Sequence, residues 1–209
     1  MRRPARDGEQ TGAEAFRKAI EELQGLYSPS VTFSLLNLLG SHDTPRFLTL
    51  ARGDLSAMRL ATLFQMTYPG APSIYYGDEI GLKGGHDPLN RGAFPWDESQ
   101  WDHDLRRETQ RLVQLRKERP ALRRGTFEFV HAANEAVAYV RELNNEIVLV
   151  ALNAGQGTCR LDLDLSRWRT AATELIFEGE RGSLMVEDGH LRGLELAPRS
   201  GRVLATPRP

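Results

Sequence analysis

The sequence has a single cysteine, Cys159, among its 209 residues. One thiol cannot form an internal disulfide, and it leaves no thiol cluster that could bind zinc or iron. Because nothing near Cys159 in the sequence resembles an activating base, we interpret it as a small apolar residue of a strand.

Long apolar runs are also missing. The longest apolar stretches are a few residues long, far below the roughly 18 to 20 residues that a membrane helix needs. Arg2, Arg3 and Arg6 near the N-terminus are followed by polar residues and not by the apolar segment of a signal peptide. We therefore expect neither membrane insertion nor export, and the expected location is cytoplasmic.

An excess of positive charge is absent as well. The 27 basic and 28 acidic residues nearly cancel, so the chain lacks the field with which proteins release counterions from phosphates. Nucleic acid is therefore not an expected partner. With 40% hydrophobic and 26% charged residues, the composition is that of a globular protein with one large domain or two modest ones.

The first half of the chain alternates helical and strand patterns. After a polar segment over residues 1–12, expected to be a frayed tail, apolar residues at helical spacing predict a helix over residues 13–25. Residues 31–39 are apolar on both faces, as in a buried parallel strand. A second helix is predicted over about residues 54–67, and a second short strand over residues 71–76. This order indicates a parallel sheet with right-handed crossovers.

The second half changes character. A long irregular stretch over residues 81–101 precedes a third helix predicted over about residues 104–118, and Pro120 marks its exit. From about residue 123 to the end, short alternating segments separated by turn residues predict an antiparallel β-sandwich. The clearest of these segments are Thr126–His131, Ala136–Arg141, Ile147–Leu152 and Cys159–Leu165.

The first predicted strand ends in polar residues that could carry chemistry. His42 and Asp43 follow it almost directly, and α/β barrels keep their sites at this end of their strands. The same residues could serve the backbone alone, with Asp43 capping a turn and His42 bonding a main-chain group. Placement by itself leaves both interpretations open.

Three segments together resemble a known family. Residues 35–46 read LLNLLGSHDTPR, residues 71–82 read APSIYYGDEIGL, and residues 84–91 read GGHDPLNR, followed by FPWD. These strings are similar to the last short conserved region, the eighth strand and the following loop of the α-amylase family of glycoside hydrolases. The resemblance is closest to neopullulanases and cyclomaltodextrinases, and it covers about residues 30–122.

The resemblance implies a fold. Residues 1–122 would hold the last strands and helices of a (β/α)8 TIM barrel, and residues 123–209 would form the β-sandwich C-terminal domain. A whole barrel takes about 250 residues, whereas residues 1–122 offer two strands. The family's nucleophilic aspartate and general-acid glutamate lie at the ends of earlier strands, and no matching motif precedes Val31. Because retaining hydrolysis needs both groups, we expect the chain alone to be inactive.

The resemblance also implies roles for four residues. Asp43 would be the third catalytic carboxylate, which binds sugar hydroxyls and helps distort the ring toward the oxocarbenium-like transition state. His42 would hydrogen-bond the same sugar. Asp87 would take further sugar hydroxyls, with Arg91 fixing its carboxylate. The implied ligand is an α-glucan or maltooligosaccharide. No cofactor is implied, and the other histidines lack the spacing of metal ligands.

Other polar and aromatic residues allow two interpretations. Asp78 and Glu79 suggest an acid and nucleophile pair, but neighbours on a strand point to opposite faces, so we interpret them as structural. Arg46 could line the site or serve as a salt-bridge partner. Trp96 and Trp101 could stack on sugar rings or pin the loop.

Two functional hypotheses compete. The first is the C-terminal fragment of a retaining α-glucan hydrolase, and the second is a non-catalytic glucan-binding or assembly module. Two barrel strands alone would expose apolar faces and an open edge. The expected partners are therefore the missing N-terminal barrel segment or further copies in a homo-oligomer.

Overall fold

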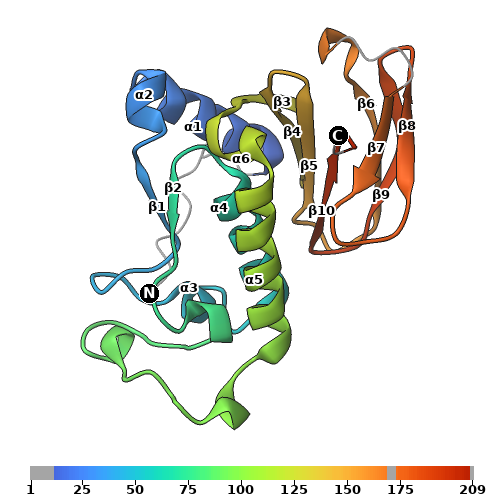
Figure 1. Ribbon diagram of the computed structural model, residues 1–209. Helices are drawn as coiled ribbons and strands as arrows, with labels where there is room; N and C mark the ends of the chain where they lie inside the picture. Colours follow the sequence, from blue (N-terminus) through green and yellow to red (C-terminus); the bar gives the residue numbers. More distant parts are fainter. Residues whose placement is uncertain (1–11, 169–172, 208–209) are drawn as a thin grey trace.

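The computed structural model describes residues 12–168 and 173–207 of the chain. A helical part carries a two-stranded parallel sheet at one side, and an eight-stranded antiparallel sheet packs against the helices (Figure 1). The helices and strands of the helical part are α1 (Ala13–Gly25), α2 (Pro29–Thr32), β1 (Leu36–Leu38), α3 (Phe47–Leu50), α4 (Leu55–Thr67), β2 (Ala71–Ser73), α5 (His103–Glu118) and α6 (Pro120–Arg124). Its short 3-10 helices are η1 (Asp78–Ile80), η2 (Leu89–Arg91) and η3 (Glu98–Gln100).

The three long helices are confirmed where the sequence predicts them. The carboxylate of Asp54 caps α4 by accepting from the Ala57 amide at 3.0 Å. Asp102 caps α5 through the Leu105 amide at 2.7 Å, so this helix begins at His103. Pro120 follows the end of α5 at Glu118, as predicted, and itself occupies the first turn of the short helix α6, where its missing amide proton costs nothing.

The two predicted parallel strands exist but are shorter than expected. They pair in parallel, Leu36 opposite Ala71 and Leu38 opposite Ser73. Residues 31–39 were predicted to be one strand buried on both faces, yet α2 precedes β1, and Leu36 and Leu38 are 62% and 52% exposed. A parallel strand is buried only when helices or strands cover both of its faces, and here α4 lies against one face, where Gln65 donates to the Asn37 carbonyl, while Leu36 and Leu38 stay exposed.

The antiparallel character of the second half is confirmed. Hydrogen bonds join its strands in the order β3-β4-β5-β10-β7-β8-β9-β6. An antiparallel β-sandwich was expected, and its two layers are joined into one continuous sheet, because β10 pairs with both β5 and β7 (Figure 1). The strands are β3 (Thr126–Ala133), β4 (Ala136–Leu143), β5 (Glu146–Asn153), β6 (Cys159–Asp164), β7 (Thr173–Phe177), β8 (Ser183–Glu187), β9 (His190–Leu196) and β10 (Ser200–Ala205), with η4 (Ser166–Trp168) after β6.

Two apolar cores lie on opposite faces of strands β4, β5 and β10. Alternating residues of β4 and β5 point to one face or the other, as strand geometry requires. The core between the two layers of the sheet includes Val140, Leu149, Leu161, Leu194 and Leu204. The core between the sheet and the helices includes Leu63, Met66, Leu112, Tyr139 and Val150. Across the described ranges, no helix combines the length and the apolar character needed to cross a membrane.

A buried arginine joins the sheet to the helical part. Arg141 of β4 donates from Nη1 to the carbonyls of Thr67 and Leu122, from Nη2 to that of Gly125, and from Nε to that of Thr126. These acceptors include the last residue of α4, whose carbonyl has no partner within its own helix. Arg141 therefore provides hydrogen bonds to main-chain carbonyls that the packing of helices on the sheet would otherwise leave without a partner.

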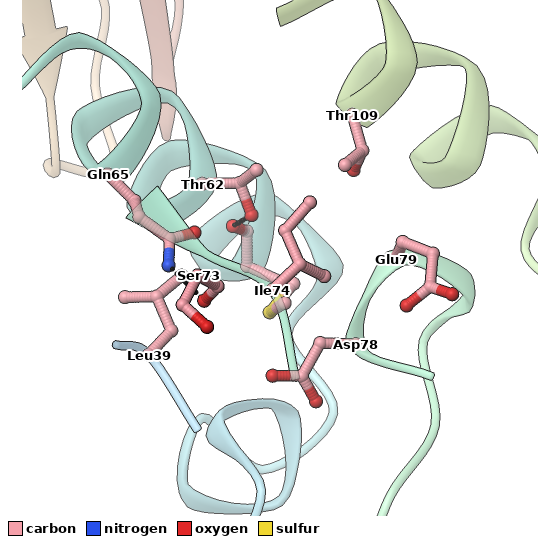
Figure 2. Close-up of a pocket in the computed structure, with 9 residues that line it drawn as sticks. Leu39, Thr62, Gln65, Ser73, Ile74, Asp78, Glu79 and Thr109 are labelled. Carbon is pink, nitrogen blue, oxygen red and sulfur yellow. Dashed lines mark hydrogen bonds between the residues drawn. The ribbon is translucent and has the colours of Figure 1, made fainter. Parts of the chain in front are cut away.

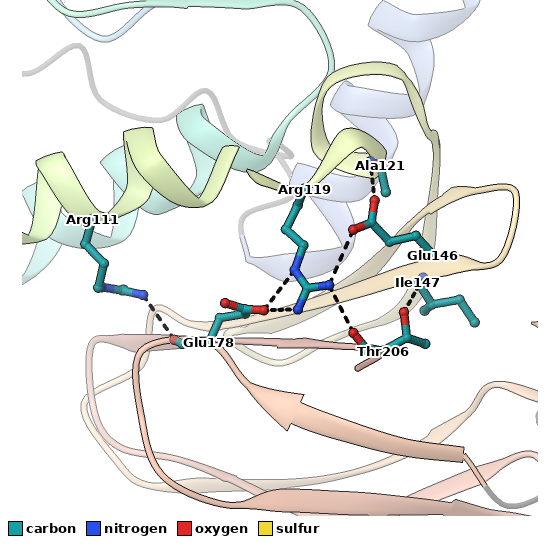
Figure 3. Close-up of polar contacts among 7 residues, drawn as sticks. All are labelled: Arg111, Arg119, Ala121, Glu146, Ile147, Glu178 and Thr206. Atoms are coloured by element: carbon teal, nitrogen blue, oxygen red, sulfur yellow. Dashed lines mark hydrogen bonds and ion pairs between the residues drawn. The ribbon is translucent and has the colours of Figure 1, made fainter. Parts of the chain in front are cut away.

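A second arginine lies at the same junction, where α5 ends (Figure 3). Arg119 is buried, and its guanidinium contacts the carboxylate of Glu178 from Nε at 2.9 Å and also from Nη2. Its Nη1 donates to the Thr206 carbonyl at 3.0 Å and lies 3.4 Å from Glu146 Oε1. The other oxygen of Glu146 accepts from the Ala121 amide at 2.6 Å, which fixes the first turn of α6.

We predict that Arg141→Met lowers the free energy of unfolding by about 3 kcal/mol or more, because four carbonyls lose their donor and three of those contacts are fully buried. The matched control is Arg167→Met, which removes an exposed arginine from its ion pair with Glu128 and should cost less than about 1 kcal/mol. Urea unfolding of both variants measures the difference. Equal stability losses would contradict the assigned role of Arg141.

Candidate functional site

His42 and Asp43 lie in the turn that follows β1. Both side chains are exposed, and His42 Nε2 lies 3.3 Å from Asp43 Oδ1. The turn is closed by Ser41 Oγ, which accepts from the Asp43 amide at 3.2 Å. In this contact Asp43 contributes its main chain, so its carboxylate is left to face solvent beside the imidazole.

Asp87 and Arg91 lie in the loop after β2, on η2 and just before it. Arg91 Nε is 2.9 Å from Asp87 Oδ1 and donates to the His42 carbonyl at 3.2 Å. The structure therefore brings together the four residues that the sequence analysis singled out, from two loops that leave adjacent strand ends. Exposed ion pairs contribute little stability, so these contacts set orientation more than they hold the fold.

Asn90 is a site residue that the sequence analysis missed. Its buried side chain donates from Nδ2 to the carbonyl of His42 at 2.8 Å and to that of Thr44 at 3.1 Å. It thereby fixes the main chain on both sides of Asp43. Its place between Asp87 and Arg91 was the available signal, but the sequence does not show that an amide reaches a loop more than 40 residues away.

Beneath these exposed groups, a buried arginine connects the same two loops. Arg46 is fully buried and donates from Nη1 to the Tyr76 carbonyl at 2.7 Å and to Asp78 Oδ1 at 3.1 Å. Its guanidinium carbon lies 4.5 Å from the ring centroid of Tyr75 and 4.8 Å from that of Tyr76. Of its two interpretations, the structure therefore supports the ion-pair partner and not the wall of the site.

Asp78 and Glu79 lie on η1 and not on a strand, so the reason given for setting them aside was wrong. Figure 2 shows their side chains leaving the turn apart from one another. Together with Thr62, Gln65 and Thr109 they line a cavity of about 10 Å³. That volume holds roughly one water molecule and no sugar ring. The structural interpretation of this pair is therefore supported by the size of the cavity.

Burial perturbs the ionisation of Asp78. Removal from water, together with the smaller effect of the neighbouring Glu79 charge, raises its pKa to about 6 against the opposing hydrogen bond and charge of Arg46. The carboxylate also needs a glycine opposite it, because a Cβ at Gly40 would lie 2.8 Å from Asp78 Oδ2. This carboxylate is thus packed tightly against the end of β1.

The two tryptophans of the loop lie differently. Trp101 donates from Nε1 to the Pro95 carbonyl at 2.6 Å, and Arg106 stacks over its ring at 4.7 Å, so Trp101 pins the loop. Trp96 is 83% exposed and touches Phe94 edge-on, with ring centroids 4.9 Å apart. Stacking of Trp96 on a sugar stays a prediction. In the described part of the chain, no group of three or more histidine, cysteine, aspartate or glutamate side chains is placed to bind a metal ion.

Comparison of the chain with known protein families identifies two matches. Residues 9–126 match the family described as Alpha amylase, catalytic domain, and residues 127–202 match Maltogenic Amylase, C-terminal domain. The first match covers more than half of the chain. The chain belongs to the α-amylase family of glycoside hydrolases.

Individual relatives are consistent with this assignment. A cyclomaltodextrinase of Bacillus sp. is 46% identical over 143 residues, which are 68% of this chain and 26% of the relative. Neopullulanase 2 of Thermoactinomyces vulgaris is 38% identical over 196 residues, 92% of this chain and 33% of the relative. A debranching enzyme of Nostoc punctiforme superposes with a TM-score of 0.82 at 36% identity, covering 94% of this chain and 40% of the other. The chain thus spans between about a quarter and two fifths of these proteins.

We predict that the buried acid makes stability depend on pH. Folded Asp78 binds its proton more tightly, with a pKa of about 6, than in the unfolded chain, where the ordinary value is 3.8. Its contribution to stability is therefore largest below about pH 4 and is lost as the pH rises through about 6. Relative to Asp78→Asn, the parent chain should gain about 2 kcal/mol between pH 7.5 and pH 4.5.

Urea unfolding of both proteins at the two pH values measures this difference, and the asparagine variant cancels the contributions of all other titrating groups. A difference that does not change with pH would show that Asp78 ionises in the folded chain as it does in water.

Proposed function

We propose that this chain is the C-terminal portion of a retaining α-glucan hydrolase. In this proposal, residues 1–122 form the last strands and helices of a (β/α)8 barrel, and residues 123–209 form the C-terminal β domain. The observation that carries it is the convergence of an imidazole, two carboxylates and a guanidinium where two neighbouring parallel strands end. Barrel enzymes keep their sites at that end of the strands.

Each of the four side chains then has a role in the proposed subsite. The exposed carboxylate of Asp43 accepts sugar hydroxyls and stabilises the positive charge that develops as the glycosidic bond breaks. His42, 3.3 Å away, donates to the same sugar. Asp87 binds further hydroxyls, and Arg91 holds its carboxylate at 2.9 Å while also bonding the loop of His42. Asn90 acts only by positioning that loop.

The proposed substrate is an α-glucan or maltooligosaccharide. The names of the relatives, cyclomaltodextrinase, neopullulanase and debranching enzyme, support a glucan of this kind. A site with exposed carboxylates and hydrogen-bond donors suits a ligand rich in hydroxyl groups.

The proposal assigns the nucleophile and the general acid to parts of the enzyme other than this chain. Retaining hydrolysis places two carboxyl groups about 5 Å apart on either side of the bond. Asp78 and Glu79 line a cavity too small for a sugar, so they do not fill these roles. The groups of this chain supply contacts and electrostatic stabilisation, and neither replaces covalent catalysis or protonation of the leaving oxygen.

We predict that the purified chain hydrolyses cyclodextrins, pullulan and starch no faster than a buffer control. The reason is chemical, because the loss of both principal carboxylates removes many orders of magnitude in rate. Release of reducing sugar measures the outcome. Robust turnover that Asp43→Asn abolishes would contradict the proposal, and Asp78 and Glu79 would then be the first residues to test.

We also predict that Asp87→Asn weakens binding of maltohexaose to the chain roughly tenfold, because the charged acceptor of sugar hydroxyls is lost. The control is Asp104→Asn, since Asp104 is another exposed aspartate paired with an arginine, here on α5. Isothermal titration calorimetry compares the two. Equal affinities of both variants would remove Asp87 from the subsite.

A further inference from the structure

A pocket opens at the end of the helical part that lies opposite the candidate site. It has a volume of about 310 Å³ and lies where α1, α2 and α6 meet the start of β3. Phe33 and Pro69, which precede β1 and β2, line this pocket, whereas His42 and Asp43 follow β1. The pocket and the candidate site therefore lie at opposite ends of the same two strands (Figure 1). We call it the junction pocket.

Three aromatic rings line the junction pocket. Tyr27 lies in the turn between α1 and α2 and is 46% exposed, and Phe33 follows α2 and is partly buried. Phe127 of β3 is fixed by edge-on contacts with Tyr68 and Phe129, with ring centroids 5.3 and 5.0 Å apart. The pocket thus combines a ring that is held by its neighbours with a ring that is open to solvent.

Polar side chains complete the lining. Arg124 is exposed at the end of α6, and its guanidinium carries five N–H donors. Gln24 of α1 hydrogen-bonds the Tyr68 side chain, and its amide can form further hydrogen bonds. Thr126 Oγ1 donates to the Glu142 carbonyl at 3.4 Å and keeps its lone pairs as acceptors. Hydrogen-bond donors and acceptors therefore lie beside the aromatic faces.

This combination suits a sugar ring better than an apolar ligand. Small-molecule sites have volumes of roughly 300 to 1,000 Å³ and combine aromatic walls with a few polar groups. The C–H face of a glucose ring fits an aromatic face, and its hydroxyls then reach the polar side chains. An apolar helix in the same place would bury the Gln24 amide and the Arg124 guanidinium without hydrogen bonds, which is costly.

We propose that the junction pocket is a second binding site for a maltooligosaccharide, in which a glucose ring stacks on Tyr27 and its hydroxyls bond Arg124 and Gln24. The choice of a glucan rests on the proposed function. The site itself is separate from that of Asp43, because it uses the other ends of β1 and β2.

A second site of this kind suits a polymeric ligand. A glucan offers the same ring many times along its length, so one molecule can supply rings to both sites. A molecule held in the junction pocket stays close to the chain when it leaves the candidate site. Its effective concentration at the candidate site is therefore raised without any new contact there.

The test is a titration of the ¹⁵N-labelled chain with maltohexaose, followed through the chemical shifts of the backbone amides. We expect one group of shifting amides over residues 24–33 and 125–127, and a separate group over residues 42–44 and 87–91. Tyr27→Ala should raise the dissociation constant of the first group at least roughly tenfold, because the stacking face is lost, and leave the second unchanged. Asp87→Asn should do the reverse.

Leu26→Ala is the matched control. Leu26 precedes Tyr27, is 70% exposed and lies outside the lining of the pocket, so this variant should bind like the parent. Tyr27→Phe keeps the ring and should also bind like the parent. Arg124→Ala gives a second measure of the same site and should weaken the first group alone. The dispersion of the amide signals checks that each variant is folded.

The pattern of shifts separates this proposal from the proposed function. Shifts confined to the amides near Asp43 would overturn the second site and leave the proposed function standing. Shifts confined to the junction pocket would support the second site and contradict the subsite of Asp43. Absence of shifts at the pocket, or an unchanged dissociation constant for Tyr27→Ala, would overturn the proposal. Pocket shifts that appear at higher protein concentration without sugar, and that Tyr27→Ala abolishes, would overturn it in favour of a second copy of the chain.

Discussion

The guanidinium of Arg46 is the contact on which the candidate site depends. It reaches from the loop after β1 to Asp78 and to the Tyr76 carbonyl in the loop after β2. Burying a guanidinium is costly; here Nη1 contacts one carboxylate and one carbonyl and the group lies over two aromatic faces, whereas Nε and Nη2 are buried without a hydrogen-bond partner. Because the arginine is fully buried, solvent does not screen these interactions, and the two loops are held at a fixed separation.

The exposed groups of the site depend on this buried contact. The pairs that His42 makes with Asp43, and Arg91 with Asp87, lie in water, where such pairs contribute little to stability. Their relative position is set instead by Arg46 below them and by the buried amide of Asn90. Binding sites commonly need rigid residues beneath their exposed side chains, since a small displacement of a side chain that contacts the substrate sharply reduces its contribution to binding or catalysis.

The periodic spacing of apolar residues predicted helices and strands better than the presence of a continuous apolar run did. The helical spacing of apolar residues in α1 and the alternation from Thr126 onward were sufficient, because both patterns depend on neighbours in the chain. The run over residues 31–39 misled, because its apolar character does not show that its first residues belong to α2 or that Leu36 and Leu38 lie exposed. The roles of Arg46 and Asn90 could not be read from the sequence, since each depends on a contact with a loop distant in the chain.

Packing against the eight-stranded sheet explains how the helices are held in place although one face of the two-stranded sheet is exposed. Leu63 of α4 and Leu112 of α5 are buried against Tyr139 and Val150 of the sheet, so these helices find their second layer there. The buried donors of Arg141 then satisfy the end of α4 at the same junction. Held from outside in this way, α4 supports β1 and β2 on one face and leaves the other face free. The sheet therefore stabilises the loops of the site at a distance, although none of its residues belongs to the candidate subsite.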